Sequence, residues 1–411
     1  MKITIVGGGI GGLTAALCLH KAGFEVKIFE SSKEIQPLGV GINILPHSVR
    51  VLTNLGLQEK IAEKAIETSN LVYFNRFGQE FWTEQRGKFA GYKWPQFSIH
   101  RGELQMLLLR EVQARLGADA VVKNHHFSSF EQNETCVMAV FVDKENGEIV
   151  HTETSDLLIG ADGIHAAVRQ QLYPNEGPPL YSENVLYRGT AHMSHFLNGK
   201  SMAMIGSLKQ KMVVYPIDPE PDTDGKYLIN WVANVKRGKA TLIDRDWNRQ
   251  YDKESLAKSY ENWKFDWLDV PAMIRKATAV YEFPMADRDP LEQWSFGRVT
   301  LMGDAAHPMY PIGSNGASQA ILDADCLAEY LKNTADPVEA LQAYSQERCP
   351  ATAKVVLQNR AKGPDQIMDM MAEWFPEGFA SHEIPHEKLA EVMDNYKKIA
   401  GFDMQSLNQK N

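Results

Sequence analysis

The sequence has few cysteines and no long apolar run. Only Cys18, Cys136, Cys326 and Cys349 occur among its 411 residues, and no two of them form a C-x-x-C pair. Neither a zinc knuckle nor a redox dithiol is indicated, and widely spaced cysteines are typical of free thiols in a reducing compartment. No apolar stretch reaches the roughly 18 residues of a membrane span. We therefore expect a cytoplasmic protein that does not enter a membrane.

The sequence also lacks an excess of positive charge. It contains 43 Lys and Arg residues against 52 Asp and Glu residues, which gives a formal net charge of −9. Binding to nucleic acid or an anionic membrane needs a basic surface, so we expect neither partner. Hydrophobic residues make up 44% and charged residues 23%, as in an ordinary globular protein. At about 150 residues per domain, two to three domains are expected.

The first thirty residues have the pattern of a strand, a helix and a second strand. Residues 2–6 form a short apolar run that stops at glycine, which is typical of a buried parallel strand. Apolar residues then recur at helical spacing over 13–20, and Gly23 suits the end of that helix. Residues 25–30 are predicted to form the second strand, which completes a βαβ unit.

Three glycines at the first turn of this unit follow the pattern G-x-G-x-x-G. Gly7 permits the tight turn, Gly9 lets a pyrophosphate approach the backbone, and Gly12 allows close packing of helix and strand. Glu30 ends the second strand, 18 residues after Gly12, where a carboxylate accepts hydrogen bonds from a ribose. The pattern predicts dinucleotide binding without distinguishing NAD from FAD. The alternative is a glycine-rich turn beside a strand-end glutamate.

Two later segments repeat the theme of a strand that ends at glycine and aspartate. One contains Asp162 and Arg169, and the other runs from Asp304 through a Pro-x-Gly loop into a helix containing Asp323. An aspartate at a strand end can accept a ribose hydroxyl. The glycine-containing loop that follows offers backbone N–H groups to an electron-rich ring or an anion.

Together these three fingerprints, spread over residues 7–323, resemble those of the group A flavoprotein monooxygenases, the single-component FAD-dependent aromatic hydroxylases. The segment 303–319 is similar to the phenazine-modifying branch, with salicylate hydroxylase-like enzymes as relatives. The resemblance implies FAD and NAD(P)H as cofactors. It implies that NAD(P)H reduces FAD, that O2 adds to form a flavin C4a-hydroperoxide, and that an electron-rich aromatic or heteroaromatic small molecule is hydroxylated, with decarboxylation as an option.

The resemblance also implies roles for individual residues. Glu30 would bind the FAD ribose, Asp304 the ribityl or pyrophosphate region, and Asp162 and Arg169 would serve both FAD and NAD(P)H. Arg101 matches an arginine that contacts FAD. The loop that would approach the isoalloxazine ring and shape its reactive face contains Tyr310, Pro311, Gly313, Ser314, Asn315 and Gly316. The sequence departs from the family pattern at Ala166, where serine is common, and at residues 313–316, where Gly-Gln-Gly is commoner.

We expect an α/β fold in which a Rossmann-type FAD-binding domain carries an inserted, mainly antiparallel β-sheet and ends in a helical C-terminus. The three fingerprints must meet at one ligand, so the first domain is discontinuous. It is predicted to comprise residues 1–75, 100–177 and 286–350. The substrate domain would take 76–99 and 178–285, and the helical segment 351–411. A monomer or homodimer is expected.

The substrate is expected between the inserted sheet and the flavin, in a largely apolar pocket with few polar groups. Candidate lining residues are Arg188, Met204, Tyr215, Trp231 and Met309. A patch of methionines and aromatic residues over 368–375 either packs a helix or forms a lid on the pocket. Two alternatives stay open: an FAD-dependent reductase that does not use oxygen, and a flavin-binding protein without turnover.

Two histidine motifs invite other interpretations. His382, Glu383 and His386 match the H-E-x-x-H zinc pattern, but Pro385 disrupts the helical turn that this site needs. We therefore expect no metal. His307, beside Asp304, is a possible catalytic base, but a structural role near the flavin is the favoured interpretation.

Overall fold

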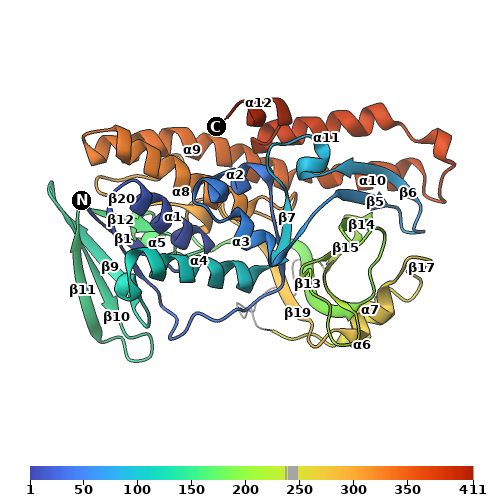
Figure 1. Ribbon diagram of the computed structural model, residues 1–411, viewed down its shortest axis with the longest axis horizontal. Coiled ribbons are helices and arrows are strands. Elements are labelled where there is room, and N and C mark those ends of the chain that lie inside the picture. The colour runs from blue at the N-terminus through green and yellow to red at the C-terminus, as the bar shows by residue number, and fades with distance from the viewer. Residues whose placement is uncertain (237, 239–248, 411) are drawn as a thin grey trace.

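The computed structural model describes residues 1–236, 238 and 249–410, and the part of the molecule at the left of Figure 1 is built on a parallel sheet of five strands. The strand order is β20 (Val299–Leu301), β12 (Leu157–Gly160), β1 (Lys2–Val6), β2 (Glu25–Phe29) and β8 (Val121–Val122). The expected βαβ unit is present, with β1 and β2 in parallel register around α1 (Ile10–Lys21). Because β1 and β12 are buried on both faces, their continuous apolar runs suit this central position.

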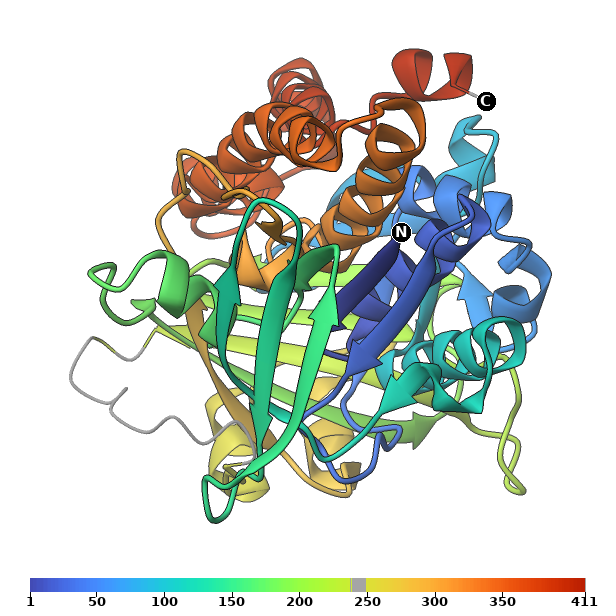
Figure 2. The same ribbon diagram turned by 90° about the vertical axis from the view of Figure 1, so that its left-hand side faces the viewer.

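Helices pack against the parallel sheet, and a small antiparallel sheet contacts its inner strands β1, β2 and β12. Helix α1 packs between α4 (Arg101–Leu116) and α8 (Gly316–Asn333). The small sheet contains β9 (His126–Gln132), β10 (Val137–Val142) and β11 (Ile149–Ser155) and stands in front in Figure 2. Phe141 of β10 stacks on Phe29 of β2, with ring centroids 4.1 Å apart.

A second large sheet is formed mainly by the inserted region. Its order is β19 (Tyr281–Asp287), β13 (Leu180–Met193), β16 (Tyr227–Lys236), β15 (Gln210–Pro216), β14 (Ser201–Ser207), β5 (Asn70–Phe74) and β6 (Glu80–Gln85). All neighbouring pairs are antiparallel except β14 with β5. Because β5 pairs with β14, the chain joins this sheet at Asn70, before the proposed boundary at residue 76. One face packs against α6 (Lys253–Ser259) and α7 (Val270–Lys276).

Three short strands connect the two large sheets. Strand β7 (Phe97–His100) pairs with both β3 (Gly41–Ile44) and β4 (Ala65–Glu67). Strand β3 leads directly to α2 (Pro46–Asn54), which packs on α8. This arrangement brings Gly41 and its neighbours between the parallel sheet and the inserted sheet.

The C-terminal part of the chain is helical and lies along one side of the molecule, orange to red in Figure 1. It contains α9 (Pro337–Arg360), α10 (Gln366–Trp374), α11 (His386–Ala400) and α12 (Met404–Gln409). Met368 and Met371 of α10 are buried against the inserted sheet, in a cluster with Met202 and Met204. Helix packing is therefore the role of these two methionines.

The predicted α/β class, the antiparallel sheet and the helical C-terminus are confirmed. Within the described ranges, no helix is long and apolar enough to cross a membrane.

Candidate active site

The three fingerprint glycines have different environments at the turn between β1 and α1. A Cβ at Gly7, where φ is +108°, would lie 2.4 Å from the carbonyl oxygen of Ala161, and a Cβ at Gly12 would lie 2.1 Å from that of Gly7. These two glycines are required by the packing of the protein itself. A Cβ at Gly9 would meet no atom of the described chain within 4 Å. Gly9 therefore leaves space beside the start of α1, which is the place a pyrophosphate takes in this type of turn.

Glu30 supports the same turn from the end of β2. Its Oε2 accepts a hydrogen bond from the backbone N–H of Gly8 at 2.7 Å, and its Oε1 accepts one from that of Ser32 at 2.8 Å. Glu30 also lines a hollow of about 390 Å³ together with Gly7, Gly9 and Asp162. A carboxylate at this position can accept ribose hydroxyl groups, as the sequence predicts.

Asp162 is placed at the beginning of α5 (Ala167–Leu172), on the far side of this hollow. Its Oδ2 accepts hydrogen bonds from the backbone N–H groups of Ala167 at 2.7 Å and Val168 at 3.2 Å. Its buried Oδ1 has no hydrogen-bond partner among the described residues. Burial raises the pKa of this carboxyl to about 6, although the backbone N–H groups oppose the shift. An acceptor without a protein partner fits a hydroxyl group of a bound dinucleotide.

Arg169 lines neither this hollow nor the cavity that adjoins it. Its guanidinium donates to the carbonyl oxygens of Ala305 at 3.0 Å and Ala306 at 2.8 Å and pairs with Glu176. The side chain is 2% exposed. Arg169 therefore holds the segment after Asp304 in place, which corrects the expectation that it contacts a cofactor, and no motif in the sequence indicates its partner Glu176.

A second cavity, the main cavity, has a volume of about 410 Å³. It shares part of its lining with the first hollow, namely Gly9, Arg101, Ala161 and Gly163. Arg101, at the start of α4, and Asp304 both line it. The side chain of Asp304 is exposed toward the cavity, yet desolvation by the surrounding protein raises its pKa, while the charges of His307 and Arg101 oppose that shift. The two cavities thus meet at the predicted cofactor residues, with space for an elongated ligand that runs from Glu30 to Asp304.

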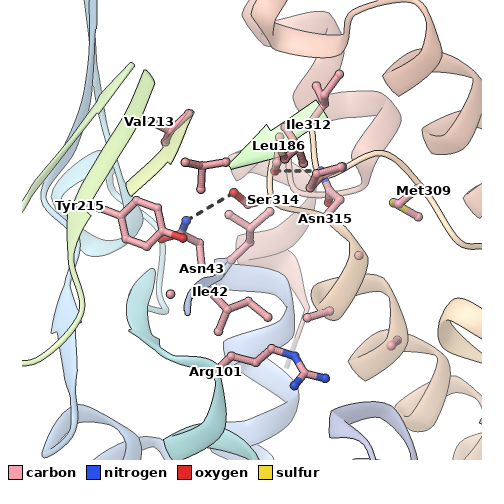
Figure 3. A pocket seen from close by; sticks show the side chains of 18 of the residues that line it. Ile42, Asn43, Arg101, Leu186, Val213, Tyr215, Met309, Ile312, Ser314 and Asn315 are labelled. Carbon is pink, nitrogen blue, oxygen red and sulfur yellow. Dashed lines mark hydrogen bonds between the residues drawn. The ribbon is translucent and has the colours of Figure 1, made fainter. Parts of the chain in front are cut away.

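The loop before α8 forms one wall of the main cavity. Gly313 and Ser314 both have left-handed backbone conformations, with φ of +66° and +57°. The amide of Asn43 donates to Ser314 Oγ at 3.4 Å, and the amide of Asn315 donates to the phenol oxygen of Tyr396 at 2.8 Å. Figure 3 shows Tyr215 and Val213 across the cavity from Asn315 and Met309. Asn43 and Tyr396 were not predicted, because neither lies near a fingerprint in the sequence.

The inserted sheet forms the opposite wall and contributes most of the predicted substrate residues. Arg188, Met204 and Tyr215 line the cavity from this sheet, and Met309 lines it from the loop side. Pro311, Gly313, Ser314, Asn315 and Gly316 also line it. Tyr310 is half-buried and is not part of the lining, although its carbonyl oxygen accepts a hydrogen bond from Asn359 at 3.1 Å.

Trp231 was expected in this cavity, and the structure corrects that expectation. Side chains alternate between the faces of a strand, and Val232 and Asn234 of β16 are those that line the cavity. Trp231 therefore points to the other face, where it is 0% exposed in the cluster formed with α6 and α7. Its ring also packs on the backbone of Gly189, where a Cβ would lie 2.4 Å from it.

A buried charge network supports the Asp304 segment from behind. Asp323 of α8 accepts a hydrogen bond from Gly303 N at 2.9 Å, and its carboxylate lies 2.6 Å from His307 Nε2 and 2.7 Å from Arg348 Nε. Burial alone would raise the pKa of Asp323, but the charges of His307 and Arg348 lower it to about 2. His307 is buried and does not line the cavity, so its position is that of a structural residue.

Comparison with known proteins identifies the group to which this arrangement belongs. A family described as FAD binding domain matches residues 1–359. The chain belongs to this FAD-binding family. It is 44% identical over 361 residues to "Phenazine 1,6-dicarboxylic acid hydroxylase PhzS" of Lysobacter antibioticus, covering 87% of this chain and 89% of that protein. It is 29% identical to "3-hydroxybenzoate 6-hydroxylase 1" of Aquipseudomonas alcaligenes, covering 87% and 88%.

Solved structures of other proteins show the same fold. A salicylate hydroxylase in complex with substrate aligns with a TM-score of 0.75 at 22% identity, covering 100% of this chain and 97% of that chain. Klebsiella pneumoniae HpxO complexed with FAD and uric acid aligns with a TM-score of 0.72 at 21% identity, covering 98% and 95%. The predicted resemblance to group A flavoprotein monooxygenases is confirmed, and the protein is an FAD-dependent enzyme of that group.

Proposed function

We propose that this enzyme uses NAD(P)H and O2 to hydroxylate an aromatic or heteroaromatic carboxylic acid, with decarboxylation as an option. The observation that carries the proposal is that the Pro311–Gly316 loop and the inserted sheet face one cavity, which continues to the glycine turn. FAD bound along that path supplies the oxygen-activating chemistry. The protein's part is to hold the ring and the substrate against each other and to exclude water.

The residues that would hold FAD are those that line its path. Gly9, Glu30 and Asp162 surround the first hollow, and Arg101 and Asp304 lie where the two hollows meet. Gly7 and Gly12 shape the turn. Gly313, Ser314, Asn315 and Gly316 would lie against the isoalloxazine ring, with Pro311 beside its reactive face and Tyr310 behind the loop.

A carboxylate on the substrate is supported by Arg188. This arginine lines the cavity, and among the described residues it forms no ion pair. Its guanidinium carbon lies 5.4 Å from the ring centroid of Phe283, and burial lowers its pKa. A cation in such surroundings is costly unless an anion accompanies it, and a ligand carboxylate would supply that anion. The curated relatives named above act on a phenazine dicarboxylic acid and a hydroxybenzoate.

The apolar part of the sheet wall suits a flat ring system. Its sheet wall includes Leu186, Met204, Val213 and Val232, which present methyl and thioether groups rather than charges. Such a surface binds the faces of aromatic rings and leaves orientation to the few polar groups.

A substrate screen with the FAD-loaded enzyme tests this proposal. NAD(P)H oxidation would be measured in air with and without phenazine carboxylates and hydroxybenzoates, and the products would be examined by mass spectrometry. We expect at least one acid to stimulate NAD(P)H oxidation and to gain oxygen. An enzyme whose flavin is reduced by NAD(P)H but which never transfers oxygen would instead be a reductase, the alternative function.

A further inference from the structure

A second group of polar side chains lines the main cavity, apart from Arg188. It consists of Tyr73, Gln96, Lys211 and Asp365, and each of these residues is at most 6% exposed. The ammonium group of Lys211 pairs with Asp365 Oδ2. They come from β5, the segment before β7, β15 and the turn before α10, so four separate parts of the chain contribute buried polar groups to this cavity.

Three atoms of this group have no hydrogen-bond partner among the residues that the structure describes. They are the Tyr73 hydroxyl, Gln96 Oε1 and Asp365 Oδ1. A buried polar atom without a partner destabilises the fold, and folded proteins contain few of them. Three such atoms beside one cavity indicate that a ligand supplies the missing partners.

Strand register places Tyr73, on β5, at the opposite end of the sheet wall from Arg188, on β13. Arg188 pairs with Val232, Val232 with Val213, Val213 with Met204 and Met204 with Tyr73. At the usual spacing between strands, this row separates the backbones of Arg188 and Tyr73 by about 19 Å. The three residues between them are apolar. Along this row the wall has a polar residue at each end and an apolar centre, and Lys211 lies beside the row on β15, two residues from Val213.

The second polar end lies beside the loop that would contact the flavin ring. Asp365 and Pro364 line the cavity together with Ile312 and Gly313. A Cβ at Gly363 would lie 2.7 Å from Ile312 Cγ2, so the turn before α10 packs directly on this loop. A substituent bound by Asp365 would therefore lie near the reacting part of the site.

At this end of the wall each cationic side chain has an anionic partner, whereas Arg188 forms no ion pair among the described residues. Lys211 is paired with Asp365, and the neighbouring lining residue Arg86 lies 3.2 Å from Glu84. Gln96 and Asp365 offer acceptors, whereas the Tyr73 hydroxyl and the Lys211 ammonium group are donors. Such a set is complementary to a neutral group that both donates and accepts hydrogen bonds. A carboxylate would have to lie against Asp365 Oδ1, with like charges in contact.

We infer that Tyr73, Gln96, Lys211 and Asp365 form a second substrate subsite, which binds a neutral donor–acceptor substituent such as a ring hydroxyl while Arg188 binds the carboxylate. This inference rests on the proposed function, since it assumes an aromatic acid in the cavity. The substrate is then an elongated ring system with a carboxylate at one end and a hydroxyl group at the other.

Binding of three related probes to the FAD-loaded enzyme tests the subsite. Phenazine-1-carboxylate, 6-hydroxyphenazine-1-carboxylate and phenazine-1,6-dicarboxylate would be titrated while the flavin absorbance is followed. We expect the hydroxyl group to tighten binding by about 10-fold or more over the monocarboxylate, as two new hydrogen bonds in a buried site would give. The second carboxylate is expected to give no such gain.

Two variants test whether these residues bind the substrate or only stabilise the fold. Tyr73→Phe and Gln96→Met should each reduce the advantage of the hydroxyl probe and leave the affinity for the monocarboxylate nearly unchanged. Because Tyr73→Phe also removes a buried hydroxyl that has no partner, the ligand-free variant should unfold at the same or a higher temperature than the parent. Tyr330→Phe, at an exposed hydroxyl that donates to Glu347, is the matched control and should bind all three probes as the parent does.

The outcomes also separate the subsite from the proposed function. If the monocarboxylate is bound and hydroxylated but the hydroxyl probe binds no tighter, or if Tyr73→Phe retains the full advantage, the subsite is wrong and the proposed function stands. If no probe binds or stimulates NAD(P)H oxidation, and no other aromatic acid does so, both are wrong.

Discussion

The phenol oxygen of Tyr396 lies 2.8 Å from the amide nitrogen of Asn315 and joins helix α11 to the loop that forms the wall of the cavity. The same oxygen lies 3.0 Å from Asn359 Oδ1, so the hydroxyl donates to α9 while it accepts from the loop. Burial raises the pKa of Tyr396 above its usual range, which keeps the phenol protonated for both roles. A residue 81 positions from Asn315 thus fixes the loop's conformation.

Replacing Tyr396 with phenylalanine should loosen this loop. The Asn315 amide would retain only its contact with the Gly313 carbonyl at 3.2 Å, and a buried hydrogen bond contributes about 1 kcal/mol. We expect stability to fall by about that amount and more of the NAD(P)H to be consumed without hydroxylated product. The ratio of hydrogen peroxide to product measures this loss of coupling. Tyr330→Phe is the control, and an unchanged ratio in Tyr396→Phe would show that the contact does not position the loop.

Two glycines of the first fingerprint should have different roles, Gly9 in FAD binding and Gly12 in the stability of the fold. Gly9→Ala places a methyl group where no described protein atom lies within 4 Å, and its φ of −75° suits alanine. This variant should unfold like the parent but bind FAD at least about 10-fold more weakly, a change of about 1.4 kcal/mol. Gly12→Ala forces a Cβ to 2.1 Å from the Gly7 carbonyl oxygen and should be destabilised by about 1–3 kcal/mol even without FAD. Apoprotein melting and FAD titration distinguish the two.

Much of the cofactor half of the site is predictable from the sequence because its rules are local. The G-x-G-x-x-G turn, Glu30 at the end of β2 and Asp304 after β20 each follow from the order of strand, turn and helix. These residues line connected cavities because the parallel strands that precede them end at the same edge of one sheet.

The errors have a different origin, since they concern which tertiary partner a side chain meets. The alternation along β16 shows that Trp231 and Val232 point to opposite faces, but only the packing of α6 and α7 decides which face is covered. In the same way, the charge of Arg169 does not reveal that Glu176 and two carbonyl groups satisfy it. Tyr396 was missed because the docking of α11 on the loop has no local sequence pattern.

Removing the charge of Arg188 should weaken the binding of acids specifically. Arg188→Met keeps the apolar part of the side chain, and we expect the KM for an aromatic acid to rise about 10- to 100-fold, as for the loss of a charged hydrogen bond. The affinity for the corresponding neutral amide should change little. Arg76→Met is the matched control, since Arg76 is exposed and donates to the carbonyl oxygen of Pro376. Equal losses for the acid and the amide would contradict an anion-binding role.

The charge network around Asp323 should make stability depend on acid pH. Because its pKa falls from about 4 in the unfolded chain to about 2 in the folded protein, its ionised form stabilises the fold above about pH 4. That contribution, on the order of 2 kcal/mol, should be lost as the pH falls from about 4 to about 2. Asp323→Asn should be less stable at neutral pH and should lack this part of the acid dependence. Urea unfolding of both proteins across this range measures the difference, and parallel curves would refute the assignment.

The central claim is that FAD in this cavity transfers oxygen from O2 to an aromatic acid. The most direct test is turnover of the FAD-loaded enzyme with NAD(P)H under oxygen gas labelled with the heavy isotope, using the acid that most stimulates NAD(P)H oxidation. We expect the product to carry one labelled oxygen atom and Arg188→Met to form it more slowly. Reduction of the flavin by NAD(P)H with no labelled oxygen in any product would show that the enzyme is not a monooxygenase of aromatic acids.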